Sequence, residues 1–149
     1  MTRPPRPGEN EAWAGWDLSG LVVDQVVVDY RLALHMFGRD RGFSLTLITP
    51  FTYRPARGEP VVIEPEEADA VLPVALAVLR RPAVSFQASS LGRCVLRFEG
   101  GAEIAHGVPD LPHEAWESGG DGPLKTARLL AGPGPGSPWG GGPPPSGTA

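Results

Sequence analysis

The chain has 149 residues and a formal net charge of −4, and 41% of its side chains are hydrophobic. This length is enough to bury one hydrophobic core. A chain with a pI near 5.3 lacks the clustered positive face that nucleic-acid binding needs, so we exclude nucleic acid as a partner. The 20 glycines and 18 prolines concentrate near the two ends, and the last 19 residues hold 13 of them.

Composition divides the chain into three parts. Residues 1–11 form a polar, Pro-rich leader that we expect to be disordered, residues 12–130 form a single α+β domain, and residues 131–149 form a disordered Gly/Pro-rich tail. The leader has no apolar stretch after its basic residues, so it does not read as a secretory signal. The longest apolar run, 70–79, is about half a membrane span, and we expect no membrane partner. Because Cys94 is the only cysteine, no internal disulfide can form, and a cytoplasmic location is expected.

Alternation of apolar and polar residues predicts the strands of the first half of the chain. Residues 21–29 are dense in valine and predict a strand. Residues 31–37 and 43–49 alternate on either side of a turn with a glycine at each end, which predicts a first β-hairpin. A short strand over 59–64 follows.

A helix is predicted over about 66–81. Apolar residues recur there at the helical period, at Ala68, Val71, Leu72, Ala75, Leu76 and Leu79. Pro65 and the carboxylates after it suit a first helical turn, and Pro82 ends the helix. Pro73 lies inside the pattern and predicts a kink or a break there.

The second half of the chain predicts further strands over 83–89, 93–99 and 102–106, with 124–130 as a last candidate. A Gly-Gly turn joins two of them into a second β-hairpin. The predicted fold class is therefore α+β. It consists of one antiparallel sheet of about six or seven strands, including two β-hairpins, with the one helix packed on one face.

The predicted core combines the apolar faces of these elements. It consists of Leu32, Leu34, Leu45, Leu47, Val62, Leu72, Leu76, Leu79, Phe86, Leu96, Phe98 and Ile104. On this interpretation, Leu76→Asp unfolds the domain because it buries an unpaired charge.

Residues 106–117 gather imidazoles and carboxylates. The candidate metal ligands are His106, Asp110, His113 and Glu114. Imidazole and carboxylate together suit zinc or non-haem iron. However, the spacing matches no closed zinc motif, and Glu117 stands where an H-E-x-x-H motif needs its second histidine. We therefore favour a polar loop whose Trp116 packs on the sheet, and we predict no metal and no cofactor.

The chain contains no G-x-S-x-G, Walker or dinucleotide-binding motif, so we predict no enzymatic activity and no catalytic residue. Cys94 lies on an apolar strand face, which favours a buried, inert thiol. Four arginines occupy loops that we expect at one end of the sheet. The candidate partner-binding residues are Arg39, Arg41, Arg54, Arg57 and Trp116.

Three short motifs carry a family resemblance. They are Trp16-Asp-Leu-Ser-Gly, Leu96-Arg-Phe-Glu-Gly-Gly, and the segment from Pro109-Asp110 to His113-Glu114-Ala115-Trp116-Glu117. Together they resemble an uncharacterised family of small actinobacterial α+β proteins, a domain of unknown function with Trp-x-Leu-x-Gly and Pro-Asp-x-x-(Tyr/His)-Glu-Ala-Trp-Glu motifs. The resemblance covers roughly residues 13–140, and His113 and Ser118 depart from the tyrosine and leucine expected there. It implies a bacterial protein and, by analogy with small proteins that neutralise toxins, an immunity-type role.

Three functions from different classes follow from these observations. The first is a small non-catalytic module that binds a protein partner through a sheet face or the arginine-rich loops. The second is a small-molecule or metal-binding protein that uses residues 106–117. The third is a structural subunit that self-associates through an exposed strand edge. The sequence leaves the identity of a partner and the oligomeric state open.

Overall fold

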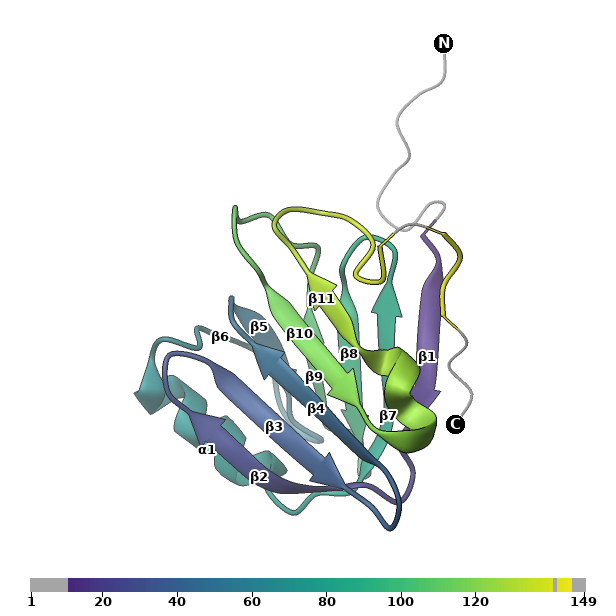
Figure 1. Cartoon of the computed structure of the whole chain (residues 1–149). Helices are drawn as coiled ribbons and strands as arrows, with labels where there is room; N and C mark the ends of the chain where they lie inside the picture. The colour runs from purple at the N-terminus through teal and green to yellow at the C-terminus, as the bar shows by residue number, and fades with distance from the viewer. Residues whose placement is uncertain (1–10, 141, 146–149) are drawn as a thin grey trace.

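The structure is a computed structural model and describes residues 11–140 and 142–145. Its strands form two antiparallel sheets (Figure 1). The six-stranded sheet has the order β1 (Trp13–Asp17), β7 (Ala83–Ser89), β8 (Cys94–Phe98), β9 (Glu103–His106), β5 (Phe51–Arg54) and β6 (Val61–Ile63). The five-stranded sheet has the order β11 (Leu129–Ala131), β10 (Trp116–Gly120), β4 (Gly42–Leu47), β3 (Leu32–Phe37) and β2 (Val22–Val28).

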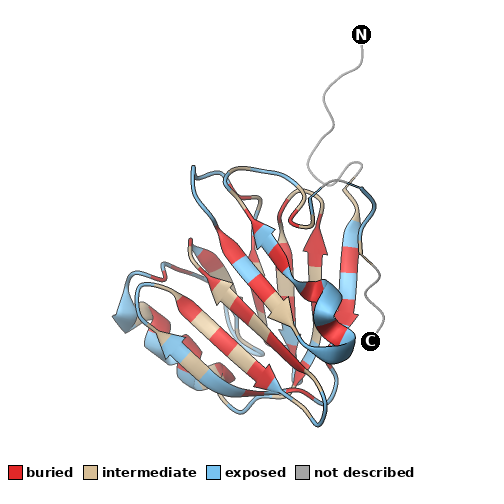
Figure 2. Ribbon diagram, in the orientation of Figure 1, coloured by how far each residue is buried: buried red, intermediate tan, exposed pale blue. Residues whose placement is uncertain are grey.

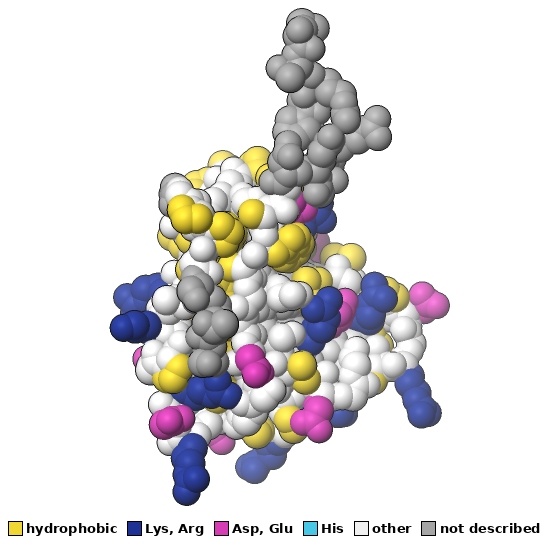
Figure 3. Space-filling view, turned by 90° about the vertical axis from the view of Figure 1, so that its right-hand side faces the viewer, with side chains coloured by type: hydrophobic (Ala, Val, Ile, Leu, Met, Phe, Trp, Pro, Cys, Tyr) yellow, Lys and Arg dark blue, Asp and Glu magenta, His cyan; other side chains and the backbone are white. Residues whose placement is uncertain are grey.

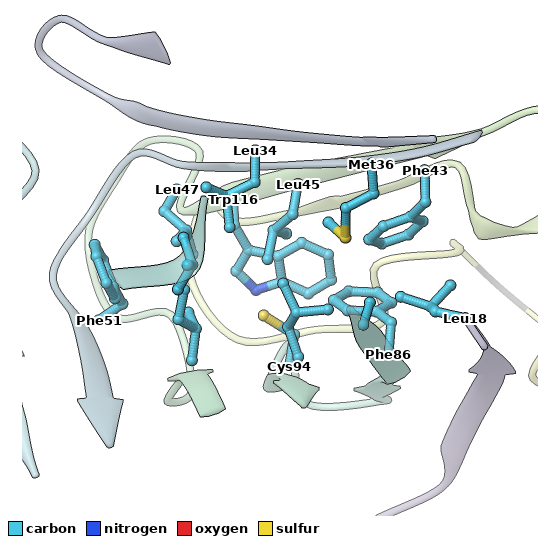
Figure 4. Close-up of a cluster of buried hydrophobic side chains, with 14 of the residues drawn as sticks. Leu18, Leu34, Met36, Phe43, Leu45, Leu47, Phe51, Phe86, Cys94 and Trp116 are labelled. Atoms are coloured by element: carbon cyan, nitrogen blue, oxygen red, sulfur yellow. The ribbon is translucent and has the colours of Figure 1, made fainter. Parts of the chain in front are cut away.

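The two sheets pack face to face around one hydrophobic core (Figures 1 and 4). Phe86 of the six-stranded sheet is central to it. Its ring lies 4.9 Å from the ring of Phe43 and 5.7 Å, edge-on, from that of Trp116, both from the other sheet. Along most strands, buried and exposed residues alternate, because successive side chains point to opposite faces (Figure 2). The inner rows of the two sheets therefore form the core.

The α+β class and both predicted hairpins are confirmed. β3 pairs with β4 and β8 pairs with β9 at the expected turns. The prediction of one sheet is wrong, because the strands divide between two layers. Three strands were not predicted, namely β1 and β5 of the six-stranded sheet and β10 of the five-stranded sheet. They are short and contain small or polar residues. The predicted strand 124–130 is mostly a 3₁₀ helix, η1 (Gly122–Ala127), which precedes β11.

The predicted helix is α1 (Ala68–Val78), which continues through Pro73 without a break. It does not cover a sheet face. One flank packs against β2, the edge strand of the five-stranded sheet, and the other flank faces β5 and β6 of the six-stranded sheet. Backbone hydrogen bonds hold its C-terminal end, because Arg80 N–H donates to the Val23 carbonyl and Val23 N–H donates to the Arg81 carbonyl. These bonds attach the end of α1 to β2.

The buried side of α1 differs from the predicted one. The structure buries Val71, Val74, Ala75 and Val78. Leu72 and Leu76 are instead 47% and 72% exposed, and Leu79 is partly exposed. Val62 on β6 is 70% exposed, so its assignment to the core is also wrong. The remaining predicted core residues are buried: Leu32, Leu34, Leu45, Leu47, Phe86, Leu96, Phe98 and Ile104.

The ends of the described chain add two observations. Residues 132–140 return past β11, where Leu130 N–H donates to the Pro138 carbonyl and Trp139 packs against the core. The other parts of the predicted leader and tail, at 1–10, 141 and 146–149, lie outside the described residues. Within the described ranges, no helix has the length and apolarity needed to cross a membrane.

Candidate functional site

His106 is a buried residue of β9 that uses both ring nitrogens. Its Nδ1 lies 2.7 Å from the Gly107 carbonyl oxygen, and its Nε2 lies 2.6 Å from the Thr49 hydroxyl. A carbonyl only accepts, so Nδ1 carries the proton and Nε2 accepts from Thr49. Burial lowers the pKa of His106, although the Gly107 carbonyl and the Asp110 charge act in the opposite direction. The histidine is thereby held neutral.

The four candidate metal ligands do not form a metal site. Among the described residues, no group of three or more His, Cys, Asp or Glu side chains is placed to hold an ion. His106 is committed to Thr49 and Gly107, whereas Asp110, His113 and Glu114 are exposed. His113 lies instead beside Pro50, Glu64 and Glu66 around a small surface hollow. The loop interpretation of this segment therefore fits its geometry better than the metal interpretation.

Trp116 is part of the core and not of a surface. It is fully buried between the sheets, and its indole N–H donates to the Gly92 carbonyl at 2.9 Å (Figure 4). The prediction that Trp116 contacts a partner is therefore wrong, because no partner can reach it in the folded protein. The alternative expectation, that it packs on the sheet, is confirmed.

The four candidate arginines come from two different sheets. Arg39 and Arg41 lie in the β3–β4 turn, and Arg41 donates to the backbone carbonyls of Asp17 and Ser19. Arg54 ends β5, where its Nε lies 3.6 Å from a Glu103 oxygen, and Arg57 follows in the β5–β6 loop. Two of the four are thus engaged in holding the fold.

Cys94 lies on the inner face of β8 and is fully buried. Burial raises the pKa of its thiol, which keeps the sulfur protonated and poorly nucleophilic. The thiol therefore behaves as a small apolar core group, as its strand position indicates.

The most unusual surface feature is a set of exposed aliphatic side chains on α1 and β6. We call it the α1–β6 face and define it by Leu72, Pro73 and Leu76 of α1 and Val61 and Val62 of β6. Apart from Pro73, these residues are between 47% and 72% exposed. On α1, residues four apart lie on one side of the helix, so the two leucines adjoin each other.

A groove of about 370 Å³ lies between α1 and β6, where Pro73, Val61 and Val62 of the α1–β6 face line it and the two leucines do not. Pro73 and Val74 of α1 form one wall, and Val61 and Val62 of β6 form the other, with Tyr53 of β5 between them. Its lining is almost entirely apolar. Burying such surface is favourable in proportion to the area that leaves water, so this face favours contact with an apolar group.

The outer face of the five-stranded sheet carries a second, polar groove. Two hollows of about 440 and 260 Å³ share Ser44, Gly119 and Arg128. The groove is deep at its base because Ser44 has a small side chain and its cross-strand neighbour Gly119 has none. Trp139 lies on one side and Phe37 on the other. This groove suits a polar ligand better than an apolar one.

Sequence reasoning missed the α1–β6 face although a signal for it was present. Asp69 is the single charged residue within α1, so the helix is apolar on nearly every side. A helix of this kind is normally buried all round. The sequence of α1 therefore gives the helix two apolar sides, and only one of them packs against the core of this protein.

Comparison with models of known families, with curated proteins and with solved structures gives no match for this chain. The resemblance to the actinobacterial family therefore stays a prediction.

Proposed function

We propose that this protein is a small non-catalytic interaction module that binds a protein partner through the α1–β6 face. The supporting observation is the exposure of Leu72 and Leu76 on a helix whose opposite side is packed into the core. Large contiguous apolar surface on a protein is commonly an interaction site. The immunity-type role suggested by the resemblance is one form that such binding takes.

Two side chains with potential reactivity are buried and take part in packing or hydrogen bonding within the protein, which agrees with a non-catalytic role. His106 is held by Thr49 and Gly107, and the Cys94 thiol is buried with a raised pKa. The working surface in this proposal is thus apolar contact area, and not a reactive group.

The test is affinity capture from cells that naturally contain the protein, with three baits. They are the wild type, Leu72→Ser/Leu76→Ser, and Leu130→Ser as the matched control. Leu130 has the same 47% exposure as Leu72 but lies on β11. We expect one stoichiometric partner on the wild type and on the control, and its loss from the double variant. Equal capture by all three baits, or no specific capture by any, contradicts the proposal.

The polar groove supports a second candidate, the binding of a small polar ligand. Its specific support is that Gly119 can accept a methyl group, because a Cβ there meets only the Ser44 hydroxyl, at 3.4 Å. Gly119→Ala therefore raises the groove floor without disturbing the fold. NMR screening of a polar fragment library tests this candidate. Hits that shift resonances around Gly119 and weaken in Gly119→Ala support it, and hits that bind both proteins equally do not.

A further inference from the structure

We infer that the partner segment which docks on the α1–β6 face is a short aliphatic stretch flanked by Lys or Arg side chains. This inference rests on the proposed function and adds the chemistry of the partner. It comes from the charges on the chain segment that builds α1 and β6.

The negative charge of this protein is concentrated in the chain segment that supplies α1 and β6. Residues 58–79, which include β6 and α1, contain five carboxylates and no Lys or Arg. The rest of the chain has 13 basic and 12 acidic residues, a net charge of +1. The whole net charge of −4 therefore arises from the segment that builds the α1–β6 face.

The carboxylates border the apolar residues at both ends of β6 and at the start of α1. They are Glu59, Glu64, Glu66, Glu67 and Asp69, and all are exposed. Glu59 and Glu64 flank Val61 and Val62 along the chain. Asp69 lies three residues before Leu72 and four before Pro73, on the same side of α1. Glu59, Glu64 and Asp69 therefore adjoin residues of the face along the chain, whereas the lining of the groove itself carries no charge.

Three arginines adjoin this segment along the chain. Arg57 lies in the β5–β6 loop, and Arg80 and Arg81 follow the C-terminal end of α1. Arg81 donates from Nε to the Ala77 carbonyl at 3.2 Å. The start of α1 thus remains an acidic boundary, and complementary potentials across an interface favour a basic partner there.

The face on the side of β1 and η1 lacks this segregation (Figure 3). Viewed from the side of β1 and η1, acidic and basic side chains are interspersed over the lower half of the molecule (Figure 3). The carboxylate excess is thus a feature of residues 58–79 and does not reflect a uniformly acidic surface.

The same charge pattern disfavours two other occupants. A second copy would bring its own five carboxylates into the contact, and like charges brought together weaken association. An anionic membrane surface is likewise repelled. A separate protein segment with aliphatic anchors and basic flanks meets both requirements of the face.

The first experiment uses a phage-displayed library of random 12-residue peptides as the probe, selected against the full-length wild-type protein. We expect enriched peptides with two or more aliphatic residues flanked by Lys or Arg. A synthetic peptide with the enriched sequence should bind the wild type and lose at least about tenfold in affinity when its flanks are changed to Glu. Its affinity should also fall as salt rises, because exposed charge pairs are screened.

Matched charge variants locate the effect on the protein. Glu59→Gln/Glu64→Gln/Asp69→Asn removes the three carboxylates that adjoin the face along the chain, and Glu99→Gln/Glu117→Gln/Asp121→Asn removes three exposed ones elsewhere. We expect affinity for the basic-flanked peptide to fall about tenfold in the first variant only. An equal fall in both variants, or no fall in either, overturns the inference.

The outcomes separate failure of the inference from failure of the proposed function. Peptides that need Leu72 and Leu76 but carry no basic flanks overturn the inference alone. Peptides that bind Leu72→Ser/Leu76→Ser as well as the wild type contradict the α1–β6 face as the docking site, and so does a selection without enrichment. Self-association that the double variant abolishes, measured by sedimentation, assigns the face to a second copy and also overturns the inference.

Discussion

At the scale of single residues, the buried polar pair of His106 and Thr49 is the most informative. His106 is a candidate metal ligand in the sequence, although no metal is predicted, and its imidazole bridges the Thr49 hydroxyl and the Gly107 carbonyl inside the core. A buried polar group without partners is costly, so this pairing explains how the core accepts a histidine. Sequence could not reveal it, because Thr49 and His106 are 57 residues apart.

His106 makes stability depend on pH. Its pKa in the folded protein is lower than the ordinary value of 6.5, chiefly because of burial. Between these two values the unfolded chain binds the proton more readily, so the free energy of unfolding rises with pH. We expect this stabilisation to be complete above the ordinary histidine pKa and to be lost as the pH falls through the lowered pKa of His106 in the folded protein.

Urea unfolding at a series of pH values measures this effect. His106→Gln is the comparison, because it removes the titration while keeping a polar side chain. We expect a smaller change in unfolding free energy between those pH values for the variant. Identical pH profiles for the two proteins would show that His106 does not control the dependence.

At the scale of elements, α1 illustrates both the strength and the limit of periodicity. The helix was predicted at 66–81 and is observed at Ala68–Val78, so its existence was well encoded. The sequence does not determine which side of the helix is buried, because two sets of apolar residues fit helical spacing. The first set is 71, 74, 75 and 78, and the second is 72, 76 and 79. In the structure the first set packs into the core, and backbone hydrogen bonds of Arg80 and Arg81 with Val23 hold the chain just after the helix against β2.

This orientation reverses the expected effect of Leu76→Asp. Leu76 is 72% exposed, so the substitution should leave the domain folded and change the free energy of unfolding by no more than about 1 kcal/mol. Val78, on the packed side of α1, is 1% exposed. Val78→Asp should therefore destabilise the domain by more than about 3 kcal/mol, because it buries an unpaired charge.

Urea titrations followed by circular dichroism compare the two variants directly. Because both add one Asp to the same helix, they differ mainly in burial. If Leu76→Asp unfolds the domain, or if the domain remains stable with Val78→Asp, the side of α1 that carries Leu72 and Leu76 is the buried one.

At the scale of the whole molecule, one core connects the two sheets. The chain passes between the layers several times, so that β1, β5–β6 and β7–β9 share one sheet while β2–β4, β10 and β11 form the other. Phe86 touches Trp16 of its own sheet and Phe43 of the opposite one. Neither sheet can bury its inner face without the other.

We therefore expect residues 12–130 to unfold as a single cooperative unit. Trp16 and Trp116 report from opposite sheets, whereas far-ultraviolet circular dichroism reports from all strands. The denaturation curves from fluorescence and circular dichroism should coincide. Two separated transitions would indicate that the sheets are stable independently and would contradict a single domain.

The alternating strands, both hairpins and the one helix were readable from the amino-acid sequence, because apolar periodicity and turn glycines are local signals. The division into two sheets depends on pairings between distant segments, such as Trp116 with Leu47 and Trp13 with Ser89. The burial of Trp116 and the exposure of Leu72 and Leu76 follow from that assembly. Local sequence patterns show which residues are apolar. Which of these residues become buried is decided by the packing of distant segments, and the same packing leaves the α1–β6 face exposed.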